Sequence, residues 1–312
     1  MSDPVVSKEE VAARGAGFPK ERQSSQSYSE TQVFFAGIMF LTRLPCPRGT
    51  NHAPVLIMRS LAYFPLIGSL IGLFAASMFS LAQTVVPAIA PAAGFATALW
   101  VSGCFHEDGL ADSFDGFGGG WSKSQILRIM QDSRVGSYAL FGSMIWMWSK
   151  LGLVAALEAR QAFYAMIAAH CIARLAPVLM IFAFPYIVDE GDAKGALYNE
   201  FNLARKHLGL FQLSIAVLTS ITVGCGMLGV TRGITAFLTI ACLAMLAGRY
   251  CASILGGVVG DFLGATVCVS ELVVYIMAGF SGIDWVQVRS AASLAFVMIS
   301  GVILYCQIIP SL

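Results

Sequence analysis

Long hydrophobic runs separated by short polar segments make up most of the chain after residue 32. A helix of about 20 apolar residues is long enough to cross the hydrocarbon core of a bilayer. The pattern therefore predicts an all-α, polytopic transmembrane helical bundle of about seven to eight spans, with amphipathic cytoplasmic helices between some of them. The candidate spans are residues 60–83, 87–103, 137–157, 162–187, 208–230, 234–255, 265–281 and 290–309.

Two N-terminal segments depart from this pattern. Residues 1–31 are polar and lack the apolar core of a signal peptide, so we expect a flexible cytoplasmic tail ahead of one membrane-embedded domain at 32–312. Residues 33–44 are apolar but too short to span, and prolines follow them, which favours an interfacial or re-entrant helix. Near its end, Arg43 is either a phosphate contact or a cation that snorkels to the lipid headgroups; the stretch alone favours the second.

The main exception to the apolar pattern is the segment 105–136, which holds five of the 18 acidic residues. These five are Glu107, Asp108, Asp112, Asp115 and Asp132. At 100° per residue, Asp108, Asp112 and Asp115 share one face of a helix, and apolar residues occupy the opposite face. Glycines at 116 and 118–120 end this helix, and Ser122 followed by Gln125 predicts the start of another.

Carboxylates gathered on one helix face repel one another unless a cation neutralises them. Hard oxygen ligands in this number suit Mg²⁺ or Mn²⁺, held by a few carboxylates together with substrate phosphates. The alternative is a solvated acidic face, which is weaker here because the surrounding chain has the character of a membrane protein. The segment therefore predicts a magnesium site.

Composition narrows the class of protein. The chain is 57% hydrophobic and 12% charged, whereas soluble domains carry about 25% charged residues. The net charge of +1 indicates no particular partner. The eight cysteines lie singly without zinc spacing, which favours reduced packing residues. No P-loop, dinucleotide fingerprint or nucleic-acid module is present, so no nucleic-acid partner is expected.

Basic residues in short loops predict the orientation. The segments 104–136 and 188–207 hold Lys123, Arg128, Arg134, Lys194, Arg205 and Lys206. The remaining turns between spans carry one arginine or none. The positive-inside rule then places both segments, and both termini, in the cytoplasm. The acidic segment is therefore expected to face cytoplasmic metabolites.

Ionisable residues in or at the ends of spans are costly and are candidates for functional sites. They are Lys150, His170, Arg174, Arg249 and Glu271. Lys150 and Arg174 are cations that could meet an anionic substrate or the carboxylates. The alternative for each is an internal ion pair that only fixes helix register, and His170 is expected to be a hydrogen-bonded packing residue. Residues 256–265 form a second glycine-rich stretch with Asp261, on the predicted cytoplasmic side.

Several motifs occur in a fixed order over about residues 33–280. They are F-L-T-R-L-P (40–45), Y-F-P-L-I-G with a later I-G (63–72), H-E-D-G-L-A-D-x-x-D-G with G-G-G (106–120), I-M-x-D-S-R-x-G (129–136), A-R (173–174) and G-G-x-x-G-D-x-x-G-A (256–265). On these motifs the chain closely resembles the cobalamin synthase family, the adenosylcobinamide-GDP ribazoletransferases of bacterial membranes. One departure is Val259, where the resemblance leads us to expect threonine.

The resemblance implies a Mg²⁺-dependent enzyme of the bacterial inner membrane. A hydroxyl of α-ribazole, or of its 5′-phosphate, attacks the cobinamide-side phosphorus of adenosylcobinamide-GDP; GMP leaves and adenosylcobalamin or its 5′-phosphate forms. Partners beside the substrates are the lipid bilayer and other late cobalamin-assembly enzymes, and a homo-oligomer is left open. The predicted residues are Glu107, Asp108, Asp112, Asp115 and Asp132 for metal, Asp115, Asp112 and Lys150 for catalysis, and Arg43, Arg128, Arg134, Arg174 and Asp261 for substrate.

Three alternatives stay open on the sequence. A CDP-alcohol phosphotransferase also uses spaced aspartates, but its D-G-x-x-A-R pattern has an arginine that this sequence lacks after Asp108. A transporter predicts carboxylates in mid-span or helices broken at the midplane. A non-catalytic scaffold predicts that Asp108→Asn leaves activity unchanged.

Overall fold

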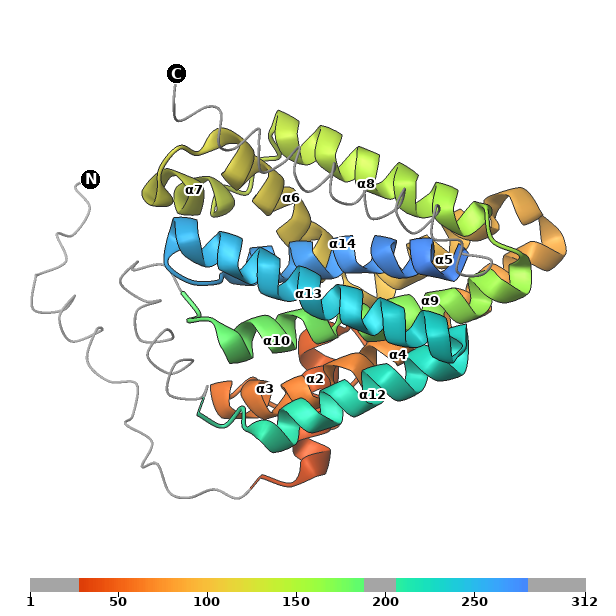
Figure 1. Cartoon of the computed structure of the whole chain (residues 1–312), viewed down its shortest axis with the longest axis horizontal. Coiled ribbons are helices and arrows are strands. Elements are labelled where there is room, and N and C mark those ends of the chain that lie inside the picture. Colours follow the sequence, from red (N-terminus) through yellow and green to blue (C-terminus); the bar gives the residue numbers. More distant parts are fainter. Residues whose placement is uncertain (1–27, 188–205, 280–312) are drawn as a thin grey trace, which may run out of the picture.

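The computed structural model describes residues 28–187 and 206–279, which form a bundle of helices (Figure 1). The helices are α2 (Glu30–Leu41), α3 (Pro54–Ser60), α4 (Phe64–Val85), α5 (Ala90–Ser102), α6 (Phe105–Gly119), α7 (Lys123–Met130), α8 (Ser137–Ala155), α9 (Ala159–Ala173), α10 (Leu175–Ala183), α12 (Leu210–Leu228), α13 (Val230–Leu255) and α14 (Gly260–Gly279). Within the described ranges the only pairing of β type is an isolated bridge between Tyr186 and Val258. The predicted all-α class is confirmed.

Among the described residues, five helical stretches are long and apolar enough to cross a membrane, and all five correspond to predicted spans. They are Pro54–Val85, Ala159–Ala183, Leu210–Leu228, Val230–Leu255 and Gly260–Gly279. A sixth would arise if α5 and α6, which meet at an angle of 92°, together form one broken span. The candidate at 137–157 forms α8 but is not among these stretches, and the candidate at 290–309, like most of the predicted tail, lies outside the described residues. The count of seven to eight spans stays a prediction.

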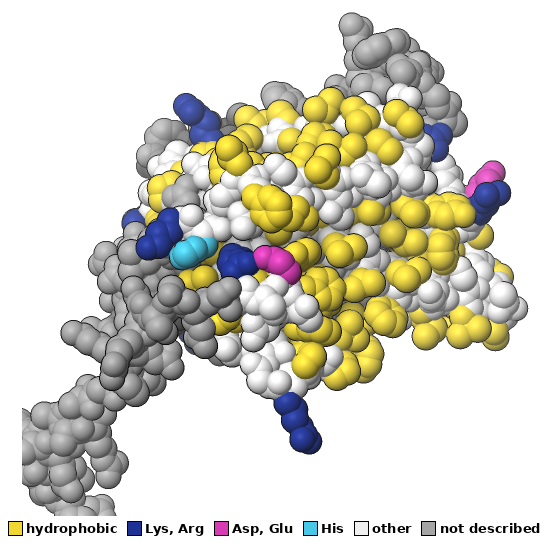
Figure 2. Space-filling model, turned by 90° about the horizontal axis from the view of Figure 1, so that it is seen from below, with side chains coloured by type: hydrophobic (Ala, Val, Ile, Leu, Met, Phe, Trp, Pro, Cys, Tyr) yellow, Lys and Arg dark blue, Asp and Glu magenta, His cyan; other side chains and the backbone are white. Residues whose placement is uncertain are grey.

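The long helices run side by side, so the connecting segments gather at two ends of the bundle (Figure 1). One end carries α3, α7 and the start of α8, and the other carries the α8–α9 and α12–α13 turns. Hydrophobic side chains cover much of the face in Figure 2, and most charged ones lie towards its ends. Outward-facing residues on α8 include Phe141, Ile145 and Trp148, each more than 60% exposed. Such a surface is typical of contact with lipid.

Glycines bring α4 and α9 into backbone contact. A Cβ atom added at Gly68 would lie 2.1 Å from the carbonyl oxygen of His170, and one added at Gly72 would lie 2.7 Å from that of Met166. Small residues at such interfaces let membrane helices approach closely. This contact explains both glycines of the motif at 63–72, and it holds the end of α9 at the centre of the bundle.

The short N-terminal helix α2 packs into the bundle. Ser29 and Gln32 form a capping box at its start, and Val33, Ala36 and Leu41 are buried. After its end, the Arg43 backbone N–H donates to the carbonyl of Val101 at 2.8 Å. A helix that ends before the prolines is therefore confirmed, and its end lies against the end of α5.

Candidate active site

The helix α6 carries the predicted acidic face, which we define as Asp108, Asp112 and Asp115. It begins after a sharp turn in which Gly103 and Cys104 both have positive φ angles, of 69° and 60°. Such angles are rare for residues other than glycine. Acidic residues in the first helical turn interact favourably with the helix dipole. The helix ends at Gly119, and Ser122 caps the following α7 by accepting from the Gln125 N–H.

Glycines on both helices let α6 cross α14 in close contact. A Cβ atom at Gly109 would lie 2.6 Å from the carbonyl oxygen of Asp261, and one at Gly264 would lie 3.2 Å from that of His106. This crossing brings Asp261 to the acidic face. The like charges that act on Asp112 are Asp261, Asp108 and Asp115, in that order. The sequence prediction that the two glycine-rich stretches share one side of the protein therefore agrees with the structure.

Asp115 has a structural role that the sequence did not predict. One carboxylate oxygen accepts from the backbone N–H of Gly136 at 2.6 Å, and the other accepts from that of Ala139 at 2.9 Å. Neither N–H group has an acceptor within α8, because both lie at its start. Asp115 therefore caps that helix from α6. The same side chain thus belongs to the acidic face and joins α6 to α8.

Replacing Asp115 with alanine is expected to destabilise the protein by about 1–2 kcal/mol, because two N–H groups at the start of α8 lose their acceptor. Asp115→Asn keeps one carbonyl oxygen and is expected to cost less. Thermal unfolding of the purified variants in detergent measures both. Equal stability of wild type and Asp115→Ala would show that the cap contributes nothing.

Asp132 and Arg134 bind one another on the surface. The Arg134 Nε atom donates to Asp132 at 2.9 Å, and the Arg134 backbone N–H donates at 3.1 Å. These bonds lower the pKa of Asp132 to about 2. A depressed pKa means that the pair's contribution to stability is present at neutral pH and is lost as the pH falls from about 4 towards 2. The structure pairs these two predicted site residues with each other.

Lys150, His170, Arg174 and Glu271 form a buried ionic cluster, and each side chain is at most 3% exposed. The Glu271 carboxylate lies 2.5 Å from the Lys150 Nζ atom, 2.7 Å from the His170 Nδ1 atom and 3.2 Å from an Arg174 guanidinium nitrogen. Arg174 also donates to the carbonyl of His170 at 2.9 Å. This arrangement corresponds to the alternative of an internal ion pair for Lys150 and Arg174.

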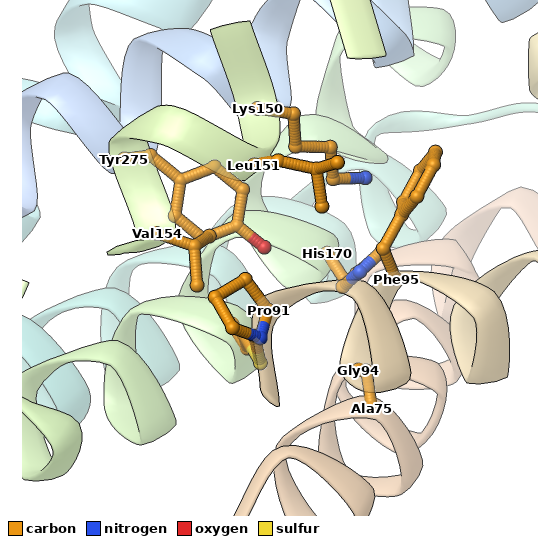
Figure 3. Close-up of a pocket in the computed structure, with 10 residues that line it drawn as sticks. Ala75, Pro91, Gly94, Phe95, Lys150, Leu151, Val154, His170 and Tyr275 are labelled. Carbon is orange, nitrogen blue, oxygen red and sulfur yellow. The ribbon is translucent and has the colours of Figure 1, made fainter. Parts of the chain in front are cut away.

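Aromatic rings and a small cavity surround Lys150. Its Nζ atom lies 4.9 Å from the ring centre of Phe95 and 5.0 Å from that of Trp146, close enough for cation–π attraction. Figure 3 shows Lys150, His170, Phe95 and Tyr275 around a cavity of about 10 Å³, which is room for about one water molecule. Lys150 therefore lies in the interior of the bundle rather than on the acidic face.

Two residues near the glycine-rich loop were missed by the sequence reasoning. Gly256 has a φ of 87°, and a Cβ atom there would lie 3.7 Å from the Lys123 Nζ atom. A Cβ atom at Gly260 would lie 3.1 Å from the Tyr186 hydroxyl oxygen. In the sequence Lys123 is one of several basic loop residues, and Tyr186 lies at the end of an apolar run without a local signal.

The acidic face offers ligands for a magnesium ion whose coordination the substrate phosphates would complete. In the described part of the chain, the Asp108 and Asp112 side chains have neither a hydrogen bond nor an ion pair. No three His, Cys, Asp or Glu side chains of that part converge in a metal-binding arrangement. Magnesium commonly takes only one or two carboxylates, together with water and phosphate oxygens. Two free aspartates beside Asp261 meet that requirement.

Comparison with known proteins gives the family of the chain. The family described as cobalamin-5-phosphate synthase matches residues 33–279. An adenosylcobinamide-GDP ribazoletransferase of Shewanella pealeana is 33% identical over 260 residues, which cover 82% of this chain and 98% of the relative. The enzyme of the same name from Shewanella oneidensis is 34% identical over 259 residues, covering 80% and 94%. No solved structure matches. The chain belongs to the cobalamin-5-phosphate synthase family.

Proposed function

We propose that this protein is an adenosylcobinamide-GDP ribazoletransferase of the bacterial cytoplasmic membrane, with its active site facing the cytoplasm. It joins α-ribazole, or its 5′-phosphate, to the cobinamide phosphate and releases GMP. The observation that carries the proposal is the acidic face of α6 beside Asp261, in a chain that matches the family over residues 33–279. The names of the relatives supply the two substrates.

The chemistry is a displacement at phosphorus, which needs charge neutralisation and alignment more than covalent catalysis. Asp108 and Asp112, beside Asp261, would hold Mg²⁺ together with pyrophosphate oxygens. When bound, the ion neutralises charge on the phosphates and on the leaving GMP. Asp112 is the candidate acceptor of the proton from the attacking hydroxyl, because both oxygens of Asp115 already accept backbone N–H groups.

Basic side chains at the same end of the bundle are candidates for phosphate contacts. Lys123 and Arg128 lie on α7, which follows α6 directly and packs against it. Both are exposed and have no ion pair with another described residue. A cation near each phosphate would orient the substrate and stabilise the leaving group.

The charge distribution supports a cytoplasmic orientation. The end with α3 and α7 carries exposed Arg48, Lys123 and Arg128, whereas the turns at the opposite end carry Arg160 and Arg232. An excess of basic residues on one side is typical of the cytoplasmic side. The acidic face lies at the α7 end, so this distribution favours access from the cytoplasm.

The proposed function is tested with purified protein in lipid vesicles. Adenosylcobinamide-GDP is supplied with α-ribazole or with its 5′-phosphate, in Mg²⁺ or in EDTA, and GMP release is followed. We expect GMP release only when an acceptor and Mg²⁺ are both present, because the acidic face needs a cation to receive a pyrophosphate. Comparing the two acceptors gives the preferred one.

Two results would contradict the proposal. Well-folded protein that releases no GMP with either acceptor would reject the transferase activity. GMP release that is equal in EDTA and in Mg²⁺ would keep the transferase activity but reject a metal role for the acidic face.

A further inference from the structure

The first turn of α6 carries two neighbouring acidic side chains in different surroundings. Asp108 is exposed, whereas the Oε2 atom of Glu107 is buried and has no hydrogen-bond partner among the described residues. The charged groups that act most on Glu107 are Lys150, Glu271 and Arg174, not the aspartates of the acidic face. Successive residues on a helix point about 100° apart, which directs Glu107 into the bundle while Asp108 points outward.

The buried ionic cluster contains more positive than negative charge. Lys150 and Arg174 each carry one positive charge, and Glu271 carries one negative charge. A buried charge without a counter-charge is costly, because the low-dielectric interior cannot replace its hydration. No ion pair joins Glu107 to another described residue, but its carboxylate interacts electrostatically with Lys150 and Arg174 and so offers the second negative charge that would balance this set.

The backbone packing places Glu107 on the stretch of α14 that leads to this cluster. The carbonyl of the preceding His106 lies against Gly264, and the His106 side chain is 4% exposed. Gly264 and Glu271 are about two helical turns apart on α14. The start of α6 is therefore close to the cluster on one side and to Asp261 on the other.

We propose that Glu107 is a positioning residue, whose carboxylate anchors the start of α6 to the buried ionic cluster and so sets the rotation of the helix that carries the acidic face. This assigns Glu107 a different role from the metal ligand that the sequence predicted. A rotation of α6 by one residue would turn Asp108 and Asp112 away from Asp261. The consequence for catalysis rests on the proposed function, whereas the anchoring itself does not.

A charge-compensation cycle tests the anchoring without substrate. The variants are Glu107→Gln, Lys150→Met and the double variant, and the readout is the apparent melting temperature in detergent. Each single change leaves one buried charge unbalanced and is expected to lower the melting temperature by about 10 °C. The double variant removes one charge of each sign, so it is expected to be more stable than the sum of the single changes predicts.

The matched control is Asp108→Asn, alone and combined with Lys150→Met. Asp108 is the exposed neighbour of Glu107, so its replacement is expected to change the melting temperature little. It is also expected not to restore the melting temperature of Lys150→Met. Where a single variant does not fold, the fraction of monodisperse protein replaces the melting temperature. Strictly additive effects of Glu107→Gln and Lys150→Met, or an equal rescue by Asp108→Asn, would overturn the proposal.

The Mg²⁺ dependence of activity distinguishes a positioning residue from a ligand. Glu107→Gln is expected to lower turnover while the Mg²⁺ concentration for half-maximal activity stays within about twofold of wild type. Asp108→Asn, which removes a candidate ligand, is expected to raise that concentration about tenfold or more. An equal rise in Glu107→Gln would make Glu107 a ligand and overturn the proposal. Absence of activity in the wild type would reject the proposed function instead, and the stability cycle would still decide the anchoring.

Discussion

Changing Asp112 to asparagine is expected to lower the rate of GMP release at least about 10²-fold. Asp112 occupies the middle of the acidic face and interacts with Asp108, Asp115 and Asp261. Asparagine keeps the size of the side chain but removes its charge, so it weakens cation binding and cannot accept the proton of the attacking hydroxyl. Initial rates in lipid vesicles at saturating substrate and several Mg²⁺ concentrations measure the loss.

The control for this change is Glu158→Gln, another replacement of a carboxylate by an amide. Glu158 is exposed at the start of α9, at the opposite end of the bundle. Its replacement is therefore expected to leave the rate of GMP release unchanged. If Asp112→Asn folded normally and kept more than about half of the wild-type rate, the acidic face could not be the catalytic centre.

Changing Gly68 to alanine is expected to prevent folding, or to destabilise the protein by more than about 4 kcal/mol. The new methyl group would lie 2.1 Å from the carbonyl oxygen of His170 and 2.6 Å from the Cδ atom of Arg174. The first of these atoms is backbone, so relief requires α4 and α9 to move apart. That movement would also pull His170 and Arg174 away from Glu271. The yield of monodisperse protein and its melting temperature in detergent measure the effect.

Gly226→Ala provides the matched control. Gly226 also lies within a helix, α12, but an added Cβ atom there meets no atom within 4 Å. Alanine favours helix more than glycine does by roughly 0.5–1 kcal/mol, so this variant is expected to be as stable as wild type or slightly more so. Equal behaviour of the two variants would show that the contact between α4 and α9 is looser than the structure indicates.

The sequence pattern predicted most of the helices because their signals are local. Runs of apolar residues gave the long helices, and the Ser122–Gln125 spacing gave the start of α7. The turn between α5 and α6 was not predicted as a bend of 92°. Only Gly103 gives a local signal there, and nothing in the neighbouring sequence indicates the positive φ of Cys104.

The site was predicted in part, for a comparable reason. Helical periodicity places Asp108, Asp112 and Asp115 on one face without knowledge of any other helix. The partners of Lys150 and Arg174 come from α14, about a hundred residues further along the chain, and no spacing rule relates them. Glu271 was noted as a charge within a span, but its position at the centre of a cluster depends on how α8, α9 and α14 pack.

Asp115 lies near the end of α6 and binds the start of α8, so both ends of the segment that contains α7 lie close together. The chain leaves α6 just after Asp115 and returns to it at Gly136 and Ala139. Within the intervening stretch α7 packs on α6, with Ile126 and Met130 against Gly116, whereas the segment 131–135 between α7 and α8 is mostly exposed. Residues could be inserted into or removed from this exposed segment without shifting the helices that hold the carboxylates. The phosphate contacts proposed for Lys123 and Arg128 could accordingly be repositioned while the acidic face stays in place.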